Sequence, residues 1–169
     1  TGAGTKFDNG VVIVTDGRVT AVGDASTPVP QGFRVVDARG RYVTPGVIDT
    51  HSHLGVYPSP GVQGMSDGNE ATNPNTAQVW AEHSLWPQDP GFNTARAGGV
   101  TTMQILPGSA NLFGGRGVTI RNVPSVTMQG MKMLRQPQPV TGHGHGQCRR
   151  LSRRLHRRPG IPVQMGQMA

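Results

Sequence analysis

The pattern of hydrophobic and polar residues divides the chain into two parts with predicted regular structure. In the first part, two β-branched runs flank Asp16 and Gly17. An Asp-Gly pair in this position predicts a β-hairpin, because glycine accepts the positive φ of the turn. After a Pro-rich connector, the apolar residues at 33–38 predict a third strand. We therefore expect a small β sheet at the start of the chain.

The second part alternates a strand, a helix and another strand. The apolar run within residues 42–53 predicts a strand. Asp89 and Pro90 are suited to begin a helix, as N-cap and first helical residue, and two glycines at 98–99 are suited to end it. Residues 100–106 predict the next strand, so that the three elements form a βαβ unit.

Weaker patterns surround these elements. Residues 76–83 have a helical composition with an apolar face, and residues 107–117 predict a glycine-rich loop. Residues 118–120 and 123–127 predict short strands. The second part is therefore expected to be an α/β structure.

Two histidines at the end of the first strand of this unit are candidates for metal binding. Residues i and i+2 of a strand point to the same face, so His51 and His53 can aim at one point while Val47 and Ile48 anchor the strand in a core. Neutral imidazole is the commonest protein ligand for divalent transition metals. A His-x-His pattern by itself also fits two structural histidines, and the pattern alone leaves both interpretations open.

The surrounding sequence connects the pair to a known family. Residues 42–53, Tyr-Val-Thr-Pro-Gly-Val-Ile-Asp-Thr-His-Ser-His, resemble the first barrel strand of the amidohydrolase superfamily, and more narrowly of its imidazolonepropionase-like and prolidase-like branch. The Gly-Val-Thr-Thr run at 99–102 resembles the same family. The resemblance implies part of a composite β-sandwich at residues 1–43 and the start of a (β/α)8 barrel at residues 44–133.

The resemblance also implies a chemistry. In the family, the histidines that correspond to His51 and His53 bind a divalent metal, most often zinc, which activates water to hydrolyse a C–N bond. The expected substrate is a small cyclic amide or peptide-like molecule. The other ligands and the proton-shuttling aspartate lie on later strands, and a (β/α)8 barrel needs about 250 residues. We therefore expect these 169 residues to be a truncated, inactive part of such an enzyme.

Two further residues are candidates for substrate contacts, since loops after barrel strands lie at the catalytic face. Glu70 lies in the polar loop after His53, together with Asp67, and could contact substrate or a second metal. Arg116, in the glycine-rich loop, offers a planar donor for a carboxylate or phosphate. A solvated or capping carboxylate and an ordinary tight loop are the alternatives.

Charge separates the last part of the chain from the rest. Residues 1–131 hold eight basic and nine acidic residues, whereas residues 132–169 hold eight basic residues and no acid, which accounts for the net charge of +7. The body therefore has no basic surface that would favour nucleic acid as a partner. The Arg-rich run at 149–158 suggests the alternative of a nucleic-acid-binding module, although it lacks aromatic residues for base stacking.

Residues 134–169 predict no core, because they are rich in Arg, Gly, Pro and Gln. Our hypothesis is a disordered or irregular basic tail produced by a shift of reading frame. A β-sandwich interaction domain in which the two histidines only pack is the remaining alternative function. The sequence has no apolar run of about 18 residues, so no membrane span is expected. A single cysteine, Cys148, excludes an internal disulfide and favours a reducing compartment such as the cytoplasm.

Overall fold

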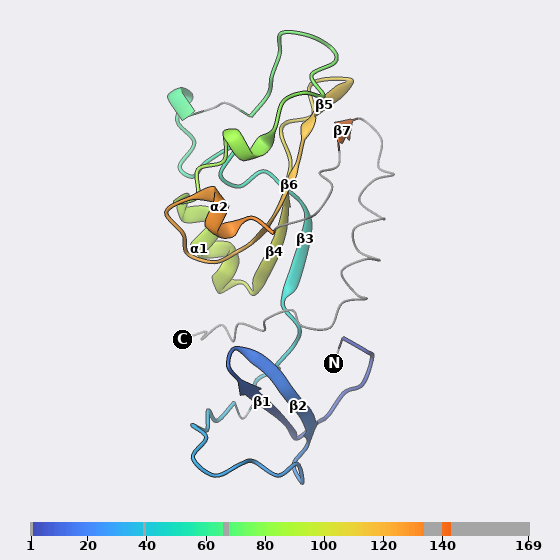
Figure 1. The fold of residues 1–169 in the computed structure, drawn as a ribbon, viewed down its shortest axis with the longest axis vertical. Helices are drawn as coiled ribbons and strands as arrows, with labels where there is room; N and C mark the ends of the chain where they lie inside the picture. Colours follow the sequence, from blue (N-terminus) through green and yellow to red (C-terminus); the bar gives the residue numbers. More distant parts are fainter. Residues whose placement is uncertain (1, 39, 66–67, 134–139, 143–169) are drawn as a thin grey trace. The chain divides into compact units, whose positions relative to one another are not determined.

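The computed structural model describes residues 2–38, 40–65, 68–133 and 140–142. These residues fall into two compact units, an N-terminal unit that ends at Gly46 and a C-terminal unit that begins at Val47 (Figure 1). None of the helices among the described residues has both the length and the apolar character of a membrane span.

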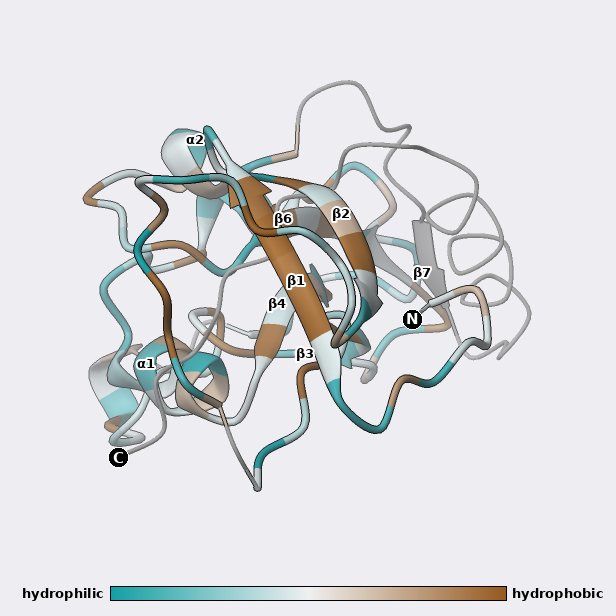
Figure 2. Ribbon diagram, turned by 90° about the horizontal axis from the view of Figure 1, so that it is seen from below, coloured by the Kyte–Doolittle hydropathy of each residue, from teal (hydrophilic) through white to brown (hydrophobic). Residues whose placement is uncertain are grey.

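The N-terminal unit contains the predicted hairpin. β1 (Gly10–Thr15) pairs antiparallel with β2 (Arg18–Asp24). The two residues between them, Asp16 and Gly17, have φ values of 52° and 71°, as a two-residue hairpin turn with two positive φ angles requires. Figure 2 shows the hydrophobic run along β1. The hairpin prediction is confirmed.

The prediction of a third strand at residues 33–38 is wrong. These residues form no regular element, and Val35 and Val36 are exposed. β-branched residues favour a strand when neighbouring strands and a core cover them. Among the described strands, β1 and β2 pair only with each other, so this apolar run has no strand to pair with. The β-sandwich of residues 1–43 stays a prediction.

The C-terminal unit is built on a three-stranded sheet with the order β3-β4-β6. β3 (Val47–Ser52) and β4 (Val100–Ile105) are parallel, and β6 (Val118–Arg121) runs antiparallel to β4. Between β3 and β4 lies α1 (Pro90–Ala97), with Asp89 as its N-cap. The predicted βαβ unit and the α/β fold class are confirmed, whereas the closed barrel stays a prediction.

One face of this sheet carries the core. α1 and α2 (Met128–Met131) lie to one side of the sheet (Figure 1). The buried apolar side chains that pack there come from both helices, from β4 and β6, and from the segments before them: Val56, Ala81, Leu85, Phe92, Met103, Ile105, Val118, Ile120, Met128 and Met131. Val47 was expected in this core but is 52 % exposed, because it is the first residue of an edge strand.

Three weaker predictions also need correction. Residues 76–83 form no α-helix and contain only the short 3-10 turn η2 (Ala81–His83). Before this turn, Trp80 forms a parallel β-bridge with Arg116. The backbone at Trp80 therefore pairs as in a strand and does not continue as a helix. Residues 123–127 form no strand but a connection into α2, and Pro124 has no N–H to give to a ladder.

Part of the predicted glycine-rich loop is a strand. β5 (Phe113–Arg116) pairs antiparallel with β7 (Val140–Gly142). β7 falls within residues 134–169, where an irregular tail was predicted, so that prediction is wrong for these three residues. The rest of the predicted tail lies outside the described residues, as does the Arg-rich run at 149–158.

Candidate metal centre

The end of β3 sets the direction of the two candidate ligands. β3 ends at Ser52, so His51 lies in the strand and His53 directly follows it, which corrects the prediction that both lie within the strand. Between Asp49 and Ser52 the register against β4 is irregular, and the N–H of His51 donates to Oδ1 of Asp49 at 3.0 Å. Irregularities of this kind, such as β-bulges, re-aim side chains and are common beside active sites.

The two imidazole rings lie close together on one face. Ser52 between them is buried, whereas His51 is exposed and His53 is half-buried, as expected when neighbouring residues alternate between faces. The ring centroids are 5.2 Å apart, and the ring planes are nearly perpendicular, at 84°. The structure therefore brings the two predicted ligands together.

A backbone carbonyl fixes the tautomer of His53. Nδ1 of His53 lies 2.8 Å from the carbonyl oxygen of Leu106, directly after β4. Because a carbonyl only accepts hydrogen bonds, Nδ1 must carry the proton, and Nε2 keeps a free lone pair in the neutral ring. Histidines that bind metals use this arrangement, in which the second ring nitrogen donates to a carbonyl or carboxylate.

The described residues fit a partial metal site. Among them, no group of three or more His, Cys, Asp or Glu side chains could hold a metal ion. The two imidazoles would supply half of a four-coordinate zinc site. The metal-binding role of His51 and His53 fits this geometry and stays a prediction.

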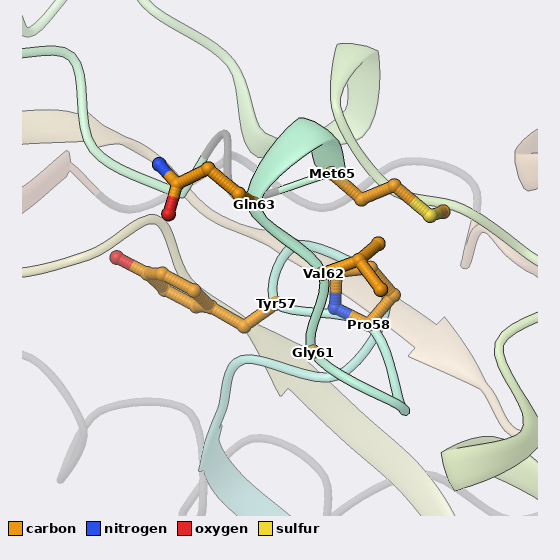
Figure 3. A pocket seen from close by; sticks show the side chains of 6 residues that line it. All are labelled: Tyr57, Pro58, Gly61, Val62, Gln63 and Met65. Atoms are coloured by element: carbon orange, nitrogen blue, oxygen red, sulfur yellow. The ribbon is translucent and has the colours of Figure 1, made fainter.

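An aromatic residue that the sequence analysis missed packs against the pair. The ring of Tyr57 meets the ring of His53 edge to face, with centroids 5.5 Å apart, and its hydroxyl accepts a hydrogen bond from Asn69 at 2.6 Å. Tyr57 also lines a small cavity of about 200 Å³ near η1 (Gln63–Met65). Figure 3 shows its ring beside Gln63 in this cavity, together with Pro58, Gly61, Val62 and Met65.

A buried carboxylate anchors the loop that follows His53. Asp89 caps α1 through a 2.8 Å bond from the N–H of Gly91. The same carboxylate accepts the N–H of Gly55 at 2.8 Å and of Ser59 at 3.0 Å. The sequence indicated the cap but gave no sign of the other two bonds, since their donors are backbone groups distant along the chain.

Glu70 lines a larger cavity, of about 470 Å³. This cavity also includes Pro107, which directly follows the carbonyl that binds His53, and the aromatic side chains of Trp80 and His83. Hydrogen bonds from the side chain and then the backbone N–H of Thr72 lower the pKa of Glu70 below its ordinary value of 4.5. Glu70 therefore presents a negative charge at neutral pH beside a cavity that a small molecule could enter.

Arg116 takes part in the packing behind this cavity. Its guanidinium lies 4.8 Å from the centroid of the Trp80 ring, and its Nε donates to the carbonyl oxygen of Ala77 at 3.2 Å. His83 stacks on the same Trp80 ring at 6.5 Å. The structure thus places Arg116 against the aromatic wall formed by Trp80 and His83. Asp67 lies outside the described residues.

Comparisons with known proteins agree with the resemblance in the sequence. No protein-family model matches the chain. Amidohydrolase tasK from Hapsidospora irregularis is 34 % identical over 162 residues, which cover 92 % of this chain. The crystal structure of an amidohydrolase from Thermotoga maritima MSB8 matches 85 % of this chain with a TM-score of 0.70 and 36 % identity. The chain belongs to the amidohydrolase superfamily.

This amidohydrolase-superfamily chain spans only part of its relatives. It covers 16 % of amidohydrolase tasK and 37 % of the solved Thermotoga maritima chain. Imidazolonepropionase from Sphingopyxis alaskensis is 50 % identical over 49 residues, or 28 % of this chain and 12 % of the relative. The identity to amidohydrolase tasK and the match to the solved Thermotoga maritima structure confirm the superfamily predicted from residues 42–53.

Proposed function

We propose that this chain supplies the first two metal ligands of an amidohydrolase that cleaves a C–N bond in a small cyclic amide or peptide-like molecule. The hydrogen bond from Nδ1 of His53 to the carbonyl of Leu106 carries the proposal. It leaves the lone pair of Nε2 free, and the centroids of the His51 and His53 rings are 5.2 Å apart. Divalent zinc suits such imidazole donors.

A divalent metal bound by these residues would polarise a carbonyl group and lower the pKa of water. The chain's own groups prepare its site. The Leu106 carbonyl holds the proton on Nδ1 of His53 and fixes the ring, while Asp49 holds the backbone of His51. Tyr57 packs edge to face against His53 and limits the movement of that ring.

The substrate would enter through the cavity of about 470 Å³. Pro107 and Glu70 line this cavity, and Pro107 directly follows Leu106, whose carbonyl accepts the hydrogen bond from His53. We propose that Glu70 accepts an N–H of the substrate, and that Arg116 assists binding by supporting the ring of Trp80. Two imidazoles alone bind a metal weakly, so we expect no turnover by the 169 residues on their own.

Zinc titration tests the proposal. We expect isothermal titration calorimetry to show weak zinc binding by the unchanged chain, and loss of that binding in the variant with His51→Ala and His53→Ala together. His83→Ala is the matched control, because His83 is an exposed histidine that contacts Trp80 and Glu82 instead of the pair. Equal zinc uptake by the double variant and the unchanged chain would favour two packing histidines and overturn the proposal.

A further inference from the structure

β4 contains a buried polar side chain, Gln104, whose amide donor has no hydrogen-bond partner among the described residues. Gln104 is 4 % exposed, and its Oε1 accepts a hydrogen bond from the hydroxyl of Thr119 at 2.7 Å. Its Nε2 is buried and has no hydrogen-bond partner among the described residues. Folded proteins leave few buried donors unpaired, because such a donor loses its water without compensation. An unpaired donor of this kind is suited to a ligand.

The sheet register places Gln104 on the face of the two histidines. Ile105 belongs to the core and pairs with the buried Ser52 of β3, so these two residues point to the core face. Since neighbouring residues in a strand alternate between faces, Gln104 points to the opposite face. His51 directly precedes Ser52 and is exposed where Ser52 is buried, so it points to that opposite face as well, and the ring of His53 lies beside the ring of His51. The unpaired amide and the two imidazoles therefore share one side of two adjacent strands.

The neighbouring strand holds the amide in place. Thr119 on β6 pairs directly with Gln104 and holds Oε1 through its hydroxyl. Just before β6, a Cβ atom at Gly117 would lie 2.5 Å from Nε2 of Gln104. A side chain at this position would collide with the amide, with the side chain of Leu106 and with the carbonyl of Ile105, so the close packing at the donor end of Gln104 requires glycine.

We propose that Nε2 of Gln104 donates a hydrogen bond to a carbonyl oxygen of the small molecule that binds on this face. An N–H donor requires an acceptor, and a neutral amide in a buried position suits an uncharged carbonyl better than a charged group. The choice of an amide as the ligand rests on the proposed function. Gln104 orients this ligand and takes no part in proton transfer.

Titration with hydantoin, a small cyclic amide, tests this role by NMR of the ¹⁵N-labelled chain. We expect the two side-chain N–H signals of Gln104, assigned by their loss in Gln104→Leu, to shift as hydantoin is added. Gln104→Leu should weaken hydantoin binding roughly tenfold or more, the effect of losing one buried hydrogen bond. Gln129→Leu changes an exposed glutamine on α2 and should leave the affinity unchanged.

Two more variants separate binding from folding and from the metal. Thr119→Val combined with Gln104→Leu replaces both partners with apolar groups, which should retain the fold while losing hydantoin binding. The double variant His51→Ala, His53→Ala should keep the Gln104 shift, because the hydrogen bond does not depend on the metal. Unshifted Gln104 signals at saturating hydantoin would overturn the inference. If the chain still binds zinc through His51 and His53, the proposed function survives that outcome.

Discussion

At the scale of single residues, the carboxylate of Asp89 joins two segments that are far apart in the sequence. It caps α1 and also holds the backbone at Gly55 and Ser59, in the loop that follows His53. The residue is 1 % exposed, so water cannot replace these bonds without local opening. The position of the loop beside the candidate metal centre therefore depends on a helix cap.

Asp89→Ala should lower the free energy of unfolding by about 2–3 kcal/mol. Loss of an N-cap costs about 1 kcal/mol, and the unpaired buried N–H of Gly55 adds about 1–2 kcal/mol. Urea unfolding followed by tryptophan fluorescence measures the change. Asp8→Asn is the control, because Asp8 is an exposed carboxylate paired with Lys6, and its loss should change stability by less than about 0.5 kcal/mol. An equally small effect at Asp89 would contradict the anchoring role.

The site residues differ in how far the sequence alone could find them. His51 and His53 stand out because their spacing matches the period of a strand and their surroundings match a family. The carbonyl of Leu106, which fixes the tautomer of His53, belongs to the backbone of another strand. Neither this carbonyl nor the unpaired amide of Gln104 leaves a pattern in the sequence, because both depend on which strands become neighbours.

At the scale of elements, local signals account for the predictions that the structure confirms. α1 has a cap before it and two glycines after it, and the β1–β2 hairpin has its turn residues between two β-branched runs. The element predicted at residues 76–83 lacks such local limits, and the one predicted at residues 33–38 has turn residues around it but no neighbouring strand among the described residues. Their conformation depends on distant partners, as the bridge from Trp80 to Arg116 shows, and composition alone could not indicate it.

An ion pair joins two of the smaller elements. Lys132, at the C-cap of α2, contacts the carboxylate of Glu82 in η2. Their side chains are only 19 % and 11 % exposed, so the pair is screened by water much less than a surface pair. This contact holds α2 against the segment that carries the aromatic wall of the larger cavity.

Lys132→Met should lower the free energy of unfolding by about 1–3 kcal/mol, because it leaves the partly buried carboxylate of Glu82 without its lysine. Replacing both residues, with Glu82→Leu added, should recover most of this loss. Thermal or urea unfolding of the single and double variants measures both effects. Lys6→Met provides the matched control at the exposed Lys6–Asp8 pair. A double variant as unstable as Lys132→Met would show that packing, and not the unpaired charge, causes the loss.

At the scale of the whole molecule, the two units differ in the size of their cores. Among the described residues, Ile13 is the only buried large hydrophobic side chain of the N-terminal unit, and the other buried hydrophobic residues belong to the C-terminal unit. Phe33, Val35, Val36, Tyr42 and Val43 of the N-terminal unit are instead exposed. A two-stranded hairpin with so little burial is at best marginally stable alone.

Hydrogen exchange should therefore separate the two units. The amides of β1 and β2 should exchange through local opening at low free energy, whereas those of β4, the central strand between β3 and β6, should exchange only in larger openings. Exchange followed by mass spectrometry, with peptides over residues 10–24 and 100–105, measures this difference. If both peptides exchange at the same slow rate, the hairpin unfolds together with the larger core, and its stability must come from contacts other than the pairing of β1 with β2. If the hairpin exchanges first, it opens while the sheet that carries His51 and Gln104 stays folded.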